Sequence, residues 1–353
     1  MVHRHVHLVG SIPLPDSASV FQTISAALAD RVTRIPDGET GARLNWIFWL
    51  EPIFSQNSGL ERSPEVFRVH PGAAPALRYR LRPGVVADDI VFGDLGYAEN
   101  ARRSYEDFAR LKRAGKIGAG CRFQVDLVPA HSVIWLFLQD DLHQPLDPKF
   151  NDAVLREIDK IAATIPHDQL AIQFDVASAV FARLARGAPN AYGQTRAEMI
   201  DRFAAIMQRL ANHVPANIEV LFHLCYGDAA HKHVVEPKDM GDMVDFVTVL
   251  MHGMTRPVQM IHFPVPRDRS DDAYFAPLRG LHLPPETGIC LGLVHYTDGI
   301  AGTKRRMATA LKYVTDFSVA TECGFGRRDP ETVPELLRIH AAAADSSGHP
   351  ASS

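Results

Sequence analysis

The segment FHLCYGD, residues 222–228, places a histidine and a cysteine two positions apart. On a β-strand His223 and Cys225 would point to the same face, because successive side chains of a strand alternate between its faces. A third candidate, Cys323, lies in the segment TECGFGRR near the end of the chain. Two cysteines and one histidine suit a tetrahedral zinc ion. We therefore predict a zinc site; the alternative is that the cysteines are small buried apolar residues and the histidine a core residue.

The composition is that of a globular enzyme with one large domain or two smaller ones: 353 residues, 46% hydrophobic, with a formal net charge of −4. This balance predicts no nucleic-acid partner and no anionic membrane surface as partner. No apolar run is long enough to cross a bilayer, and the N-terminus lacks the apolar core of a signal peptide. Four scattered cysteines predict no disulfide framework. We expect a cytoplasmic protein with free thiols.

Short β-rich runs alternate along the chain with longer segments of helical periodicity. Eight such runs predict a (β/α)8 TIM barrel; they are HVHLVGSIP, RVTRIPDGE, FQVDLVPAHS, LAIQFDVAS, IEVLFHLCYGD, VQMIHFPV, GICLGLVHY and FSVATECGFG. Residues from about 50 to 110, rich in Pro, Gly and Arg, interrupt the alternation after the second strand. We interpret them as an inserted segment that covers part of the barrel mouth. Residues 1–340 are predicted to form one catalytic domain, and the small residues of 341–353 a disordered tail.

The chemistry of a TIM barrel lies at the C-terminal ends of its strands. Nearly every predicted strand ends in polar or metal-binding residues, which are Ser11, Asp37, Glu39, His131, Asp175, His223, Cys225, His262, His295, Asp298, Glu322 and Cys323. Packing alone does not explain such a distribution. The sequence therefore predicts an active site at this end of the barrel.

The segments VGSIP, IPDGE, VFGDL, IQFDV, FHLCYGD and TECGFGRR, in this order, resemble the C-terminal catalytic barrel of cobalamin-independent methionine synthases. The resemblance covers most of residues 5–330. In that family a zinc ion held by His, Cys, Glu and Cys binds a thiol substrate as thiolate, which attacks an alkyl donor. The resemblance thus implies a zinc-dependent thiol methyl- or alkyltransferase. Its partners would be a small-molecule thiol and an alkyl donor, and a homo-oligomer is compatible with it.

The resemblance also assigns roles to single residues. His223 and Cys225 match the first two ligands of the family and Cys323 matches the last. His262, in MIHFP, stands where the family has its glutamate, which implies a fourth zinc ligand. The alternative is that His262 lies in the mouth as a substrate contact or general base. His295 matches a proposed proton donor to the leaving group.

Three further residues match positions that hold the amino acid substrate in the family. Glu39 of DGE and Asp175 of QFD match carboxylates of the substrate site, and Ser11 matches a backbone-contact position. The alternative for the two carboxylates is a salt bridge to an arginine such as Arg43 or Arg327.

The sequence departs from the family pattern in two places that bear on substrate choice. DVA replaces DEP after the fourth strand, so that Val176 stands where the family has a second carboxylate. PAH replaces the tryptophan that folate-using members have beyond the third strand. We therefore predict that methyltetrahydrofolate is not the preferred alkyl donor.

A metal-dependent hydrolase, deaminase or lyase on the same barrel is the alternative function. The segment HVHLVGS resembles the opening of adenosine-deaminase-type barrels, and His3, His5 and His7 alternate as a metal-binding strand would require. Such enzymes need an aspartate at the eighth strand end, where this chain has Glu322 and Cys323. We therefore interpret the three histidines as structural and favour the transferase.

Overall fold

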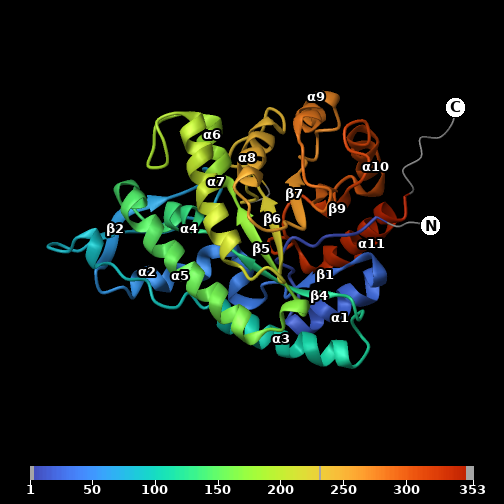
Figure 1. Cartoon of the computed structure of the whole chain (residues 1–353), viewed down its shortest axis with the longest axis horizontal. Coiled ribbons are helices and arrows are strands. Elements are labelled where there is room, and N and C mark those ends of the chain that lie inside the picture. Colours follow the sequence, from blue (N-terminus) through green and yellow to red (C-terminus); the bar gives the residue numbers. More distant parts are fainter. Residues whose placement is uncertain (1–3, 230–231, 347–353) are drawn as a thin grey trace.

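The computed structural model describes residues 4–229 and 232–346. Its centre is a curled sheet of seven strands, which are β1 (Arg34–Pro36), β4 (Arg122–Leu127), β5 (Leu170–Val176), β6 (Glu219–Leu224), β7 (Met260–Pro264), β8 (Gly288–Val294) and β9 (Ser318–Thr321). They are ordered β1-β4-β5-β6-β7-β8-β9, and every adjacent pair is parallel. Helices surround the sheet (Figure 1), as parallel strands joined by helical crossovers require.

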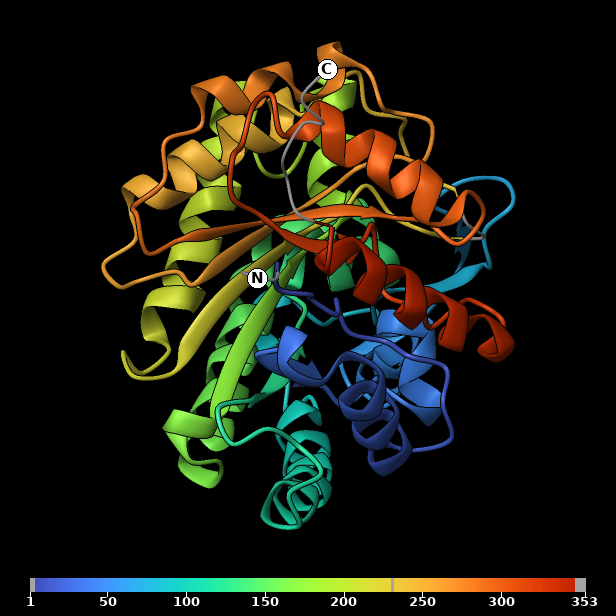
Figure 2. The ribbon, with the colours of Figure 1, turned by 90° about the vertical axis from the view of Figure 1, so that its right-hand side faces the viewer.

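The N-terminal segment lies between the two edges of this sheet. Val6 forms parallel bridges with Val32, just before β1, and with Val319 of β9. The Val6 backbone N–H donates to Arg31 O (2.8 Å), and the His7 N–H donates to Val319 O (2.9 Å). The first predicted strand is therefore present as a single bridging residue and joins the edge strands. Figure 2 shows the strands crossing the middle of the molecule with helices around them.

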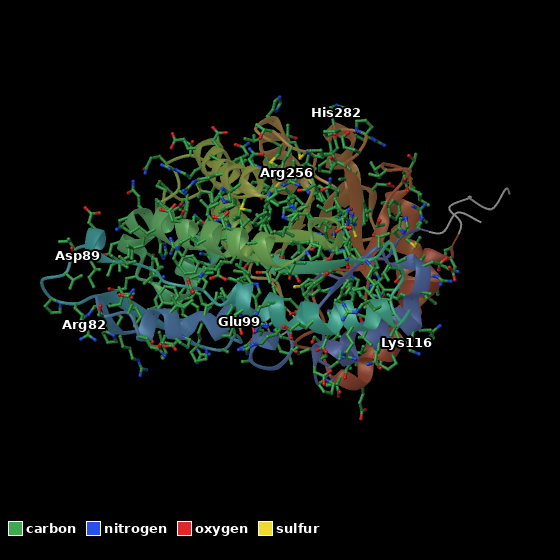
Figure 3. All side chains as sticks on the ribbon, turned by 60° about the horizontal axis from the view of Figure 1, so that its bottom comes forward. Arg82, Asp89, Glu99, Lys116, Arg256 and His282 are labelled. Atoms are coloured by element: carbon green, nitrogen blue, oxygen red, sulfur yellow. The ribbon has the colours of Figure 1, made fainter. Side chains whose placement is uncertain are left out.

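The helices occupy most of the segments between strands. They are α1 (Ser17–Leu28), α2 (Glu51–Ser55), α3 (Tyr97–Arg113), α4 (Ala130–Phe137), α5 (His143–Thr164), α6 (Ser178–Arg186), α7 (Arg196–His213), α8 (Gly241–His252), α9 (Asp272–Phe275), α10 (Gly299–Ala310) and α11 (Val333–Ala344). The longer ones are amphipathic: α3 buries Phe108 and Leu111, whereas Glu99 on the same helix is exposed, like Lys116 shortly after it (Figure 3).

The segment between β1 and β4 contains an antiparallel hairpin apart from the main sheet. Its strands are β2 (Leu60–Phe67) and β3 (Ala76–Leu81). Helices α2 and α3 flank the hairpin along the chain. The range 50–110, in which the sequence breaks its alternation, thus has regular structure of its own.

The interior of the curled sheet is layered along the strands. One layer is apolar and takes one residue from each of six segments, namely Val9, Ala171, Leu221, Met260, Cys290 and Ala320. Gln173 and His223 lie two residues further along β5 and β6 than this layer, and therefore on the same face of the sheet. The register pairs Asp175 with His223, and His223 with His262. Alternation and register therefore place polar side chains together near the C-terminal ends of the strands.

The first residues of the predicted C-terminal tail, 341–353, are helical. Helix α11 continues to Ala344, because the alanines from position 341 have high helix propensity. Residues 347–353 and His3 lie outside the described residues. Over the described ranges, no helix combines the length and apolar character that a membrane span requires.

Candidate metal and substrate site

The structure brings together the three residues of the predicted zinc site. His223 lies one residue before the end of β6, Cys225 follows that strand, and Cys323 follows β9; their ligand atoms lie within 4.8 Å of one another. The two sulfur atoms are 3.7 Å apart. A tetrahedral zinc ion with Zn–S bonds of about 2.3 Å separates two sulfur ligands by roughly 3.8 Å. The donor set and its spacing thus fit a tetrahedral metal ion.

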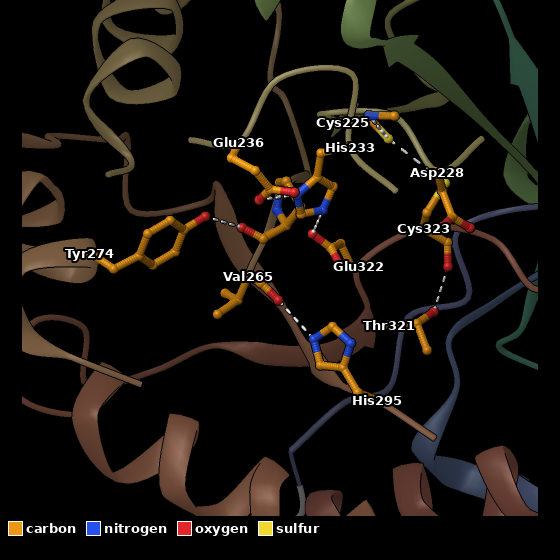
Figure 4. Close-up of polar contacts among 12 residues, drawn as sticks. Cys225, Asp228, His233, Glu236, Val265, Tyr274, His295, Thr321, Glu322 and Cys323 are labelled. Carbon is orange, nitrogen blue, oxygen red and sulfur yellow. Dashed lines mark hydrogen bonds and ion pairs between the residues drawn. The ribbon is translucent and has the colours of Figure 1, made fainter. Parts of the chain in front are cut away.

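The two thiols differ in their surroundings (Figure 4). The Cys225 thiol donates a hydrogen bond to the Cys323 sulfur, which lowers the pKa of Cys323. The Arg327 guanidinium, 3.5 Å from the same sulfur, also lowers it, against the opposing effect of burial. The pKa of Cys225 is raised well above its usual value by this same bond and by burial. Arg327 is itself held by Asp228, whose backbone oxygen accepts from Nε at 2.7 Å. Of the two sulfur atoms, that of Cys323 therefore takes the thiolate form more readily.

His262 lies beside this group of three and is not part of it. Its Nδ1 is 2.8 Å from Nδ1 of His223, and its Nε2 donates to the Thr321 carbonyl oxygen at 3.1 Å. Complete burial lowers the pKa of His262 to about 3. The ring is therefore neutral, and both of its nitrogen atoms have protein partners.

His295, the predicted proton donor, follows β8 and is buried. Its Nε2 donates to the Val265 carbonyl oxygen at 2.8 Å (Figure 4). Burial lowers its pKa to about 4, although the Glu322 carboxylate acts in the opposite direction. His295 is thus neutral near pH 7 and does not contribute to the wall of the cavity described next.

A cavity of about 140 Å³ adjoins the three candidate metal ligands. Its wall includes Ser11, Glu39, Asp175 and Arg327, together with the aromatic side chains of Trp46 and Phe48. All three residues that the sequence assigns to the substrate site therefore line one cavity with the candidate metal ligands.

Glu39 and Asp175 share a part of this cavity that lacks a paired cation. Burial and the mutual repulsion with Asp175 raise the pKa of Glu39 to about 8. Burial and the nearby Cys323 raise the pKa of Asp175 to about 8. Arg43 pairs with Asp37 at 2.6 Å, and Arg327 with Asp228 at 3.2 Å. Among the described residues, no ion pair joins Glu39 or Asp175 to an arginine, so the salt-bridge alternative is not formed.

Asp126 is a third buried carboxylate that the sequence analysis missed. It accepts a hydrogen bond from Gln124 at 2.9 Å, and burial and then Asp175 raise its pKa well above the usual value. A Cβ atom on Gly10 would lie 2.9 Å from Asp126 Oδ2 and 3.5 Å from Glu39 Oε2. The signal was present in the sequence, because Gln124 and Asp126 alternate on β4 as Gln173 and Asp175 do on β5.

Ser11 connects the segment GSIP to the segment CGFG. Its Oγ accepts a hydrogen bond from the Gly326 N–H at 3.2 Å, and its carbonyl oxygen accepts one from Phe325 at 2.6 Å. A Cβ atom on Gly324 would lie 2.4 Å from Ser11 Oγ, and one on Gly326 would lie 2.7 Å from Ser11 Cβ. Glycines at these two positions allow the first segment of the chain to approach the Cys323 loop closely.

Two residues of the cavity wall have strained backbones. Glu39 has φ +45° and Trp46 has φ +51°, a region that residues other than glycine rarely adopt. The N–H of Glu39 donates to Asp37 Oδ1 at 2.8 Å, which helps to hold this turn. Trp46 in turn donates to the Asp175 carboxylate. Such strain is typical of functional sites, where the surrounding structure must hold it.

The mouth of the cavity is formed by two loops far apart in sequence. Val69, Ala73 and Ala74, between β2 and β3, line the cavity, as do Ala229 and Val234 after β6. The His70 ring contacts the Ala229 carbonyl oxygen at 2.6 Å, which joins the two loops. The loop between β2 and β3 thus contributes to the cavity wall.

The sequence matches no protein-family model and no curated protein. Solved structures do match its fold. A B12-independent methionine synthase from Shewanella sp. W3-18-1, solved in complex with selenomethionine, has a TM-score of 0.61 at 13% identity, over 97% of each chain. A putative vitamin-B12-independent methionine synthase from Listeria monocytogenes has a TM-score of 0.52 at 14% identity, over 93% of this chain and 86% of that chain. The predicted resemblance is thereby confirmed at the level of the fold.

Proposed function

We propose that the protein is a zinc-dependent thiol alkyltransferase of the methionine synthase type. His223, Cys225 and Cys323 would hold the zinc ion, and the fold would be a complete (β/α)8 barrel whose first strand is the segment around Val6. The observation that carries the proposal is the sulfur separation of 3.7 Å beside a cavity with unpaired carboxylates. The metal would supply one function, which is to hold the substrate thiol as thiolate at neutral pH.

The substrate that fits this cavity is a small amino acid with a thiol group. An unpaired carboxylate in a buried site is costly, so Glu39 and Asp175 favour a ligand that brings an ammonium group. Ser11 also lines the cavity, and its backbone would contact the rest of the substrate amino acid. The selenomethionine bound by the Shewanella protein is an amino acid of this size class, which supports the assignment.

We propose that His295 passes a proton to the leaving group. Because Val265 accepts from its Nε2–H, the transferred proton would have to sit on Nδ1. The low pKa of His295 means that this nitrogen is unprotonated at rest. Nδ1 would therefore have to take up a proton before the transfer.

The zinc content of the purified protein tests the proposal. We expect about one zinc ion per chain and a strong loss in Cys225→Ser and in Cys323→Ser, since each removes a thiolate ligand. Cys121→Ser is the matched control, because Cys121 lies outside the group of three. Wild-type zinc levels in both site variants would refute the site.

The choice of alkyl donor is a separate prediction. Residues 129–131, PAH, replace the tryptophan of folate-using members, so methyltetrahydrofolate with homocysteine should give little methionine. The measurement is product formation by zinc-loaded protein with this donor, compared with other methylated donors. Rapid turnover with methyltetrahydrofolate would show that the missing tryptophan does not decide donor choice.

A further inference from the structure

His262 lies behind His223, on the neighbouring strand of the sheet. The register of β6 and β7 pairs the two residues directly, and their ring centroids are 4.8 Å apart. One nitrogen of each ring takes part in the contact, Nδ1 to Nδ1 at 2.8 Å. The other nitrogen of His262, Nε2, is 3.1 Å from the Thr321 carbonyl oxygen.

The Thr321 carbonyl determines where the hydrogen atoms lie. A carbonyl oxygen only accepts, so Nε2 of His262 carries the hydrogen. Both partners of His262 are uncharged and the ring is fully buried, which favours the neutral form. Nδ1 of His262 is then an acceptor, and His223 must donate to it from its own Nδ1. This leaves Nε2 of His223 as a bare nitrogen with a free lone pair.

We propose that His262 is a positioning residue, which fixes the tautomer and the ring orientation of His223, and is not the fourth metal ligand. The inference rests on the proposed function, since it assumes a metal ion at His223, Cys225 and Cys323. Histidines that bind metals commonly donate their second N–H to an acceptor in just this way. In most such proteins the acceptor is a carboxylate, a carbonyl or a water; here it is a second imidazole.

The role has a consequence for the substrate. If His262 bound the metal through Nδ1, His223 would lose its acceptor; if it bound through Nε2, Thr321 would lose its donor. The thiol would then have to displace a protein ligand. With His262 as a positioning residue, the metal has three protein ligands and one position free for the substrate, which is the arrangement of catalytic zinc sites.

Two substitutions at position 262 separate a ligand from a positioning residue. In His262→Gln the amide oxygen can accept from His223 and the amide N–H₂ can donate to Thr321, so both contacts can be kept. His262→Leu removes both. We expect the zinc affinity of His262→Gln, measured by competition with a chromophoric chelator, to stay within a few-fold of wild type. That of His262→Leu should fall about 10- to 100-fold.

X-ray absorption of the zinc-loaded protein gives the ligand count. We expect one imidazole and two sulfur scatterers in both wild type and His262→Gln. Two imidazoles in wild type, with one lost in His262→Gln, would overturn the positioning role and leave the proposed function intact. Protein without bound zinc would overturn both.

The tautomers can be measured without any metal. Long-range ¹⁵N–¹H correlation spectra of metal-free wild type, assigned with His262→Gln, should show hydrogen on Nδ1 of His223 and on Nε2 of His262. Hydrogen on Nε2 of His223 would overturn the inference. This measurement and the Gln variant decide the question even if His262→Leu fails to fold.

Discussion

At the scale of single residues, the site is held in an unfavourable electrostatic state. Glu39, Asp126 and Asp175 are carboxyl groups whose pKa values are all raised, first by burial; Asp175 then raises the pKa values of Glu39 and Asp126, and Cys323 raises that of Asp175. Without a cation these groups hold their protons more strongly than isolated carboxyl groups do. A bound ammonium group would replace those protons and stabilise the carboxylates. The cluster therefore favours ligands that carry an amine.

Glu39→Gln should stabilise the metal-free protein at high pH. Because the pKa of Glu39 is about 8 in the folded protein and near 4.5 in the unfolded chain, the folded state binds the proton more tightly. The wild-type free energy of unfolding therefore falls as pH rises from about 5 to about 8. Glutamine removes this loss, and we expect a gain of roughly 0.5–2 kcal/mol at pH 8.5 with little at pH 5.

Urea unfolding at the two pH values measures this difference. Glu286→Gln is the control, because Glu286 is exposed on the surface and should show no such dependence. An equal change at both pH values would mean that Glu39 is not protonated in the folded protein.

At this scale sequence reasoning could select candidate metal ligands but not their contacts. The spacing of His223 and Cys225 predicts a common face, and the structure places both beside Cys323. The position of His262 in its motif suggested a zinc ligand. A motif match does not show that both ring nitrogens contact other residues, His223 and Thr321. Asp126 was not predicted, because the candidate residues of this strand were sought beyond its end, whereas Asp126 lies within β4.

At the scale of elements, the positions of polar residues follow from strand alternation, whereas the closure of the sheet does not. Seven predicted strands are present with the expected parallel order. The first is reduced to the bridge at Val6, since pairing of its neighbours depends on how two distant edges approach each other. The hairpin β2–β3 lies in a segment without clear helix or strand periodicity. The sequence could therefore indicate that the alternation of strands and helices is interrupted there, but not which structure the segment forms.

Gly324→Ala tests the contact between the first segment and the last strand. The added methyl group would meet Ser11 Oγ at 2.4 Å and its backbone nitrogen at 3.1 Å. We expect a loss of about 1–3 kcal/mol in the free energy of unfolding of the metal-free protein. Ser11→Ala in the same chain should restore part of it, because it removes the oxygen atom that clashes.

The control for this pair is Gly118→Ala, at which an added Cβ meets nothing within 4 Å. Additive effects of Ser11→Ala and Gly324→Ala would show that the two segments do not approach as closely as described.

At the scale of the whole molecule, the fold is shared with proteins to which the sequence is only distantly similar. At 13% identity the fold is matched over 97% of both chains. A barrel core requires apolar residues of suitable size, and many sequences satisfy that requirement. Chemistry at the strand ends requires particular residues. This difference explains why short segments at strand ends carried the resemblance while no family model matches the sequence.

The metal ion would also link distant parts of the chain. His223 belongs to β6, Cys225 follows it and Cys323 follows β9, and β7 and β8 lie between these two strands in the sheet. A shared ion would join the two sides of the curled sheet, and the Cys323 loop carries the glycines that contact Ser11. Removal of the metal should therefore lower the stability of the whole domain and not only that of one loop.

We expect the zinc-loaded protein to lose on the order of 5–10 °C in Tm when the metal is removed by a chelator, since a tightly bound ligand stabilises the state that binds it. Addition of zinc should restore the transition. In Cys225→Ser the chelator should have little effect, because that variant has little metal to lose, whereas Cys121→Ser should respond like wild type. Differential scanning calorimetry measures the Tm of each protein with and without the chelator. If the wild-type Tm did not change while zinc was shown to leave, the ion would not link the strands, and the three residues would be stabilised by the protein packing around them.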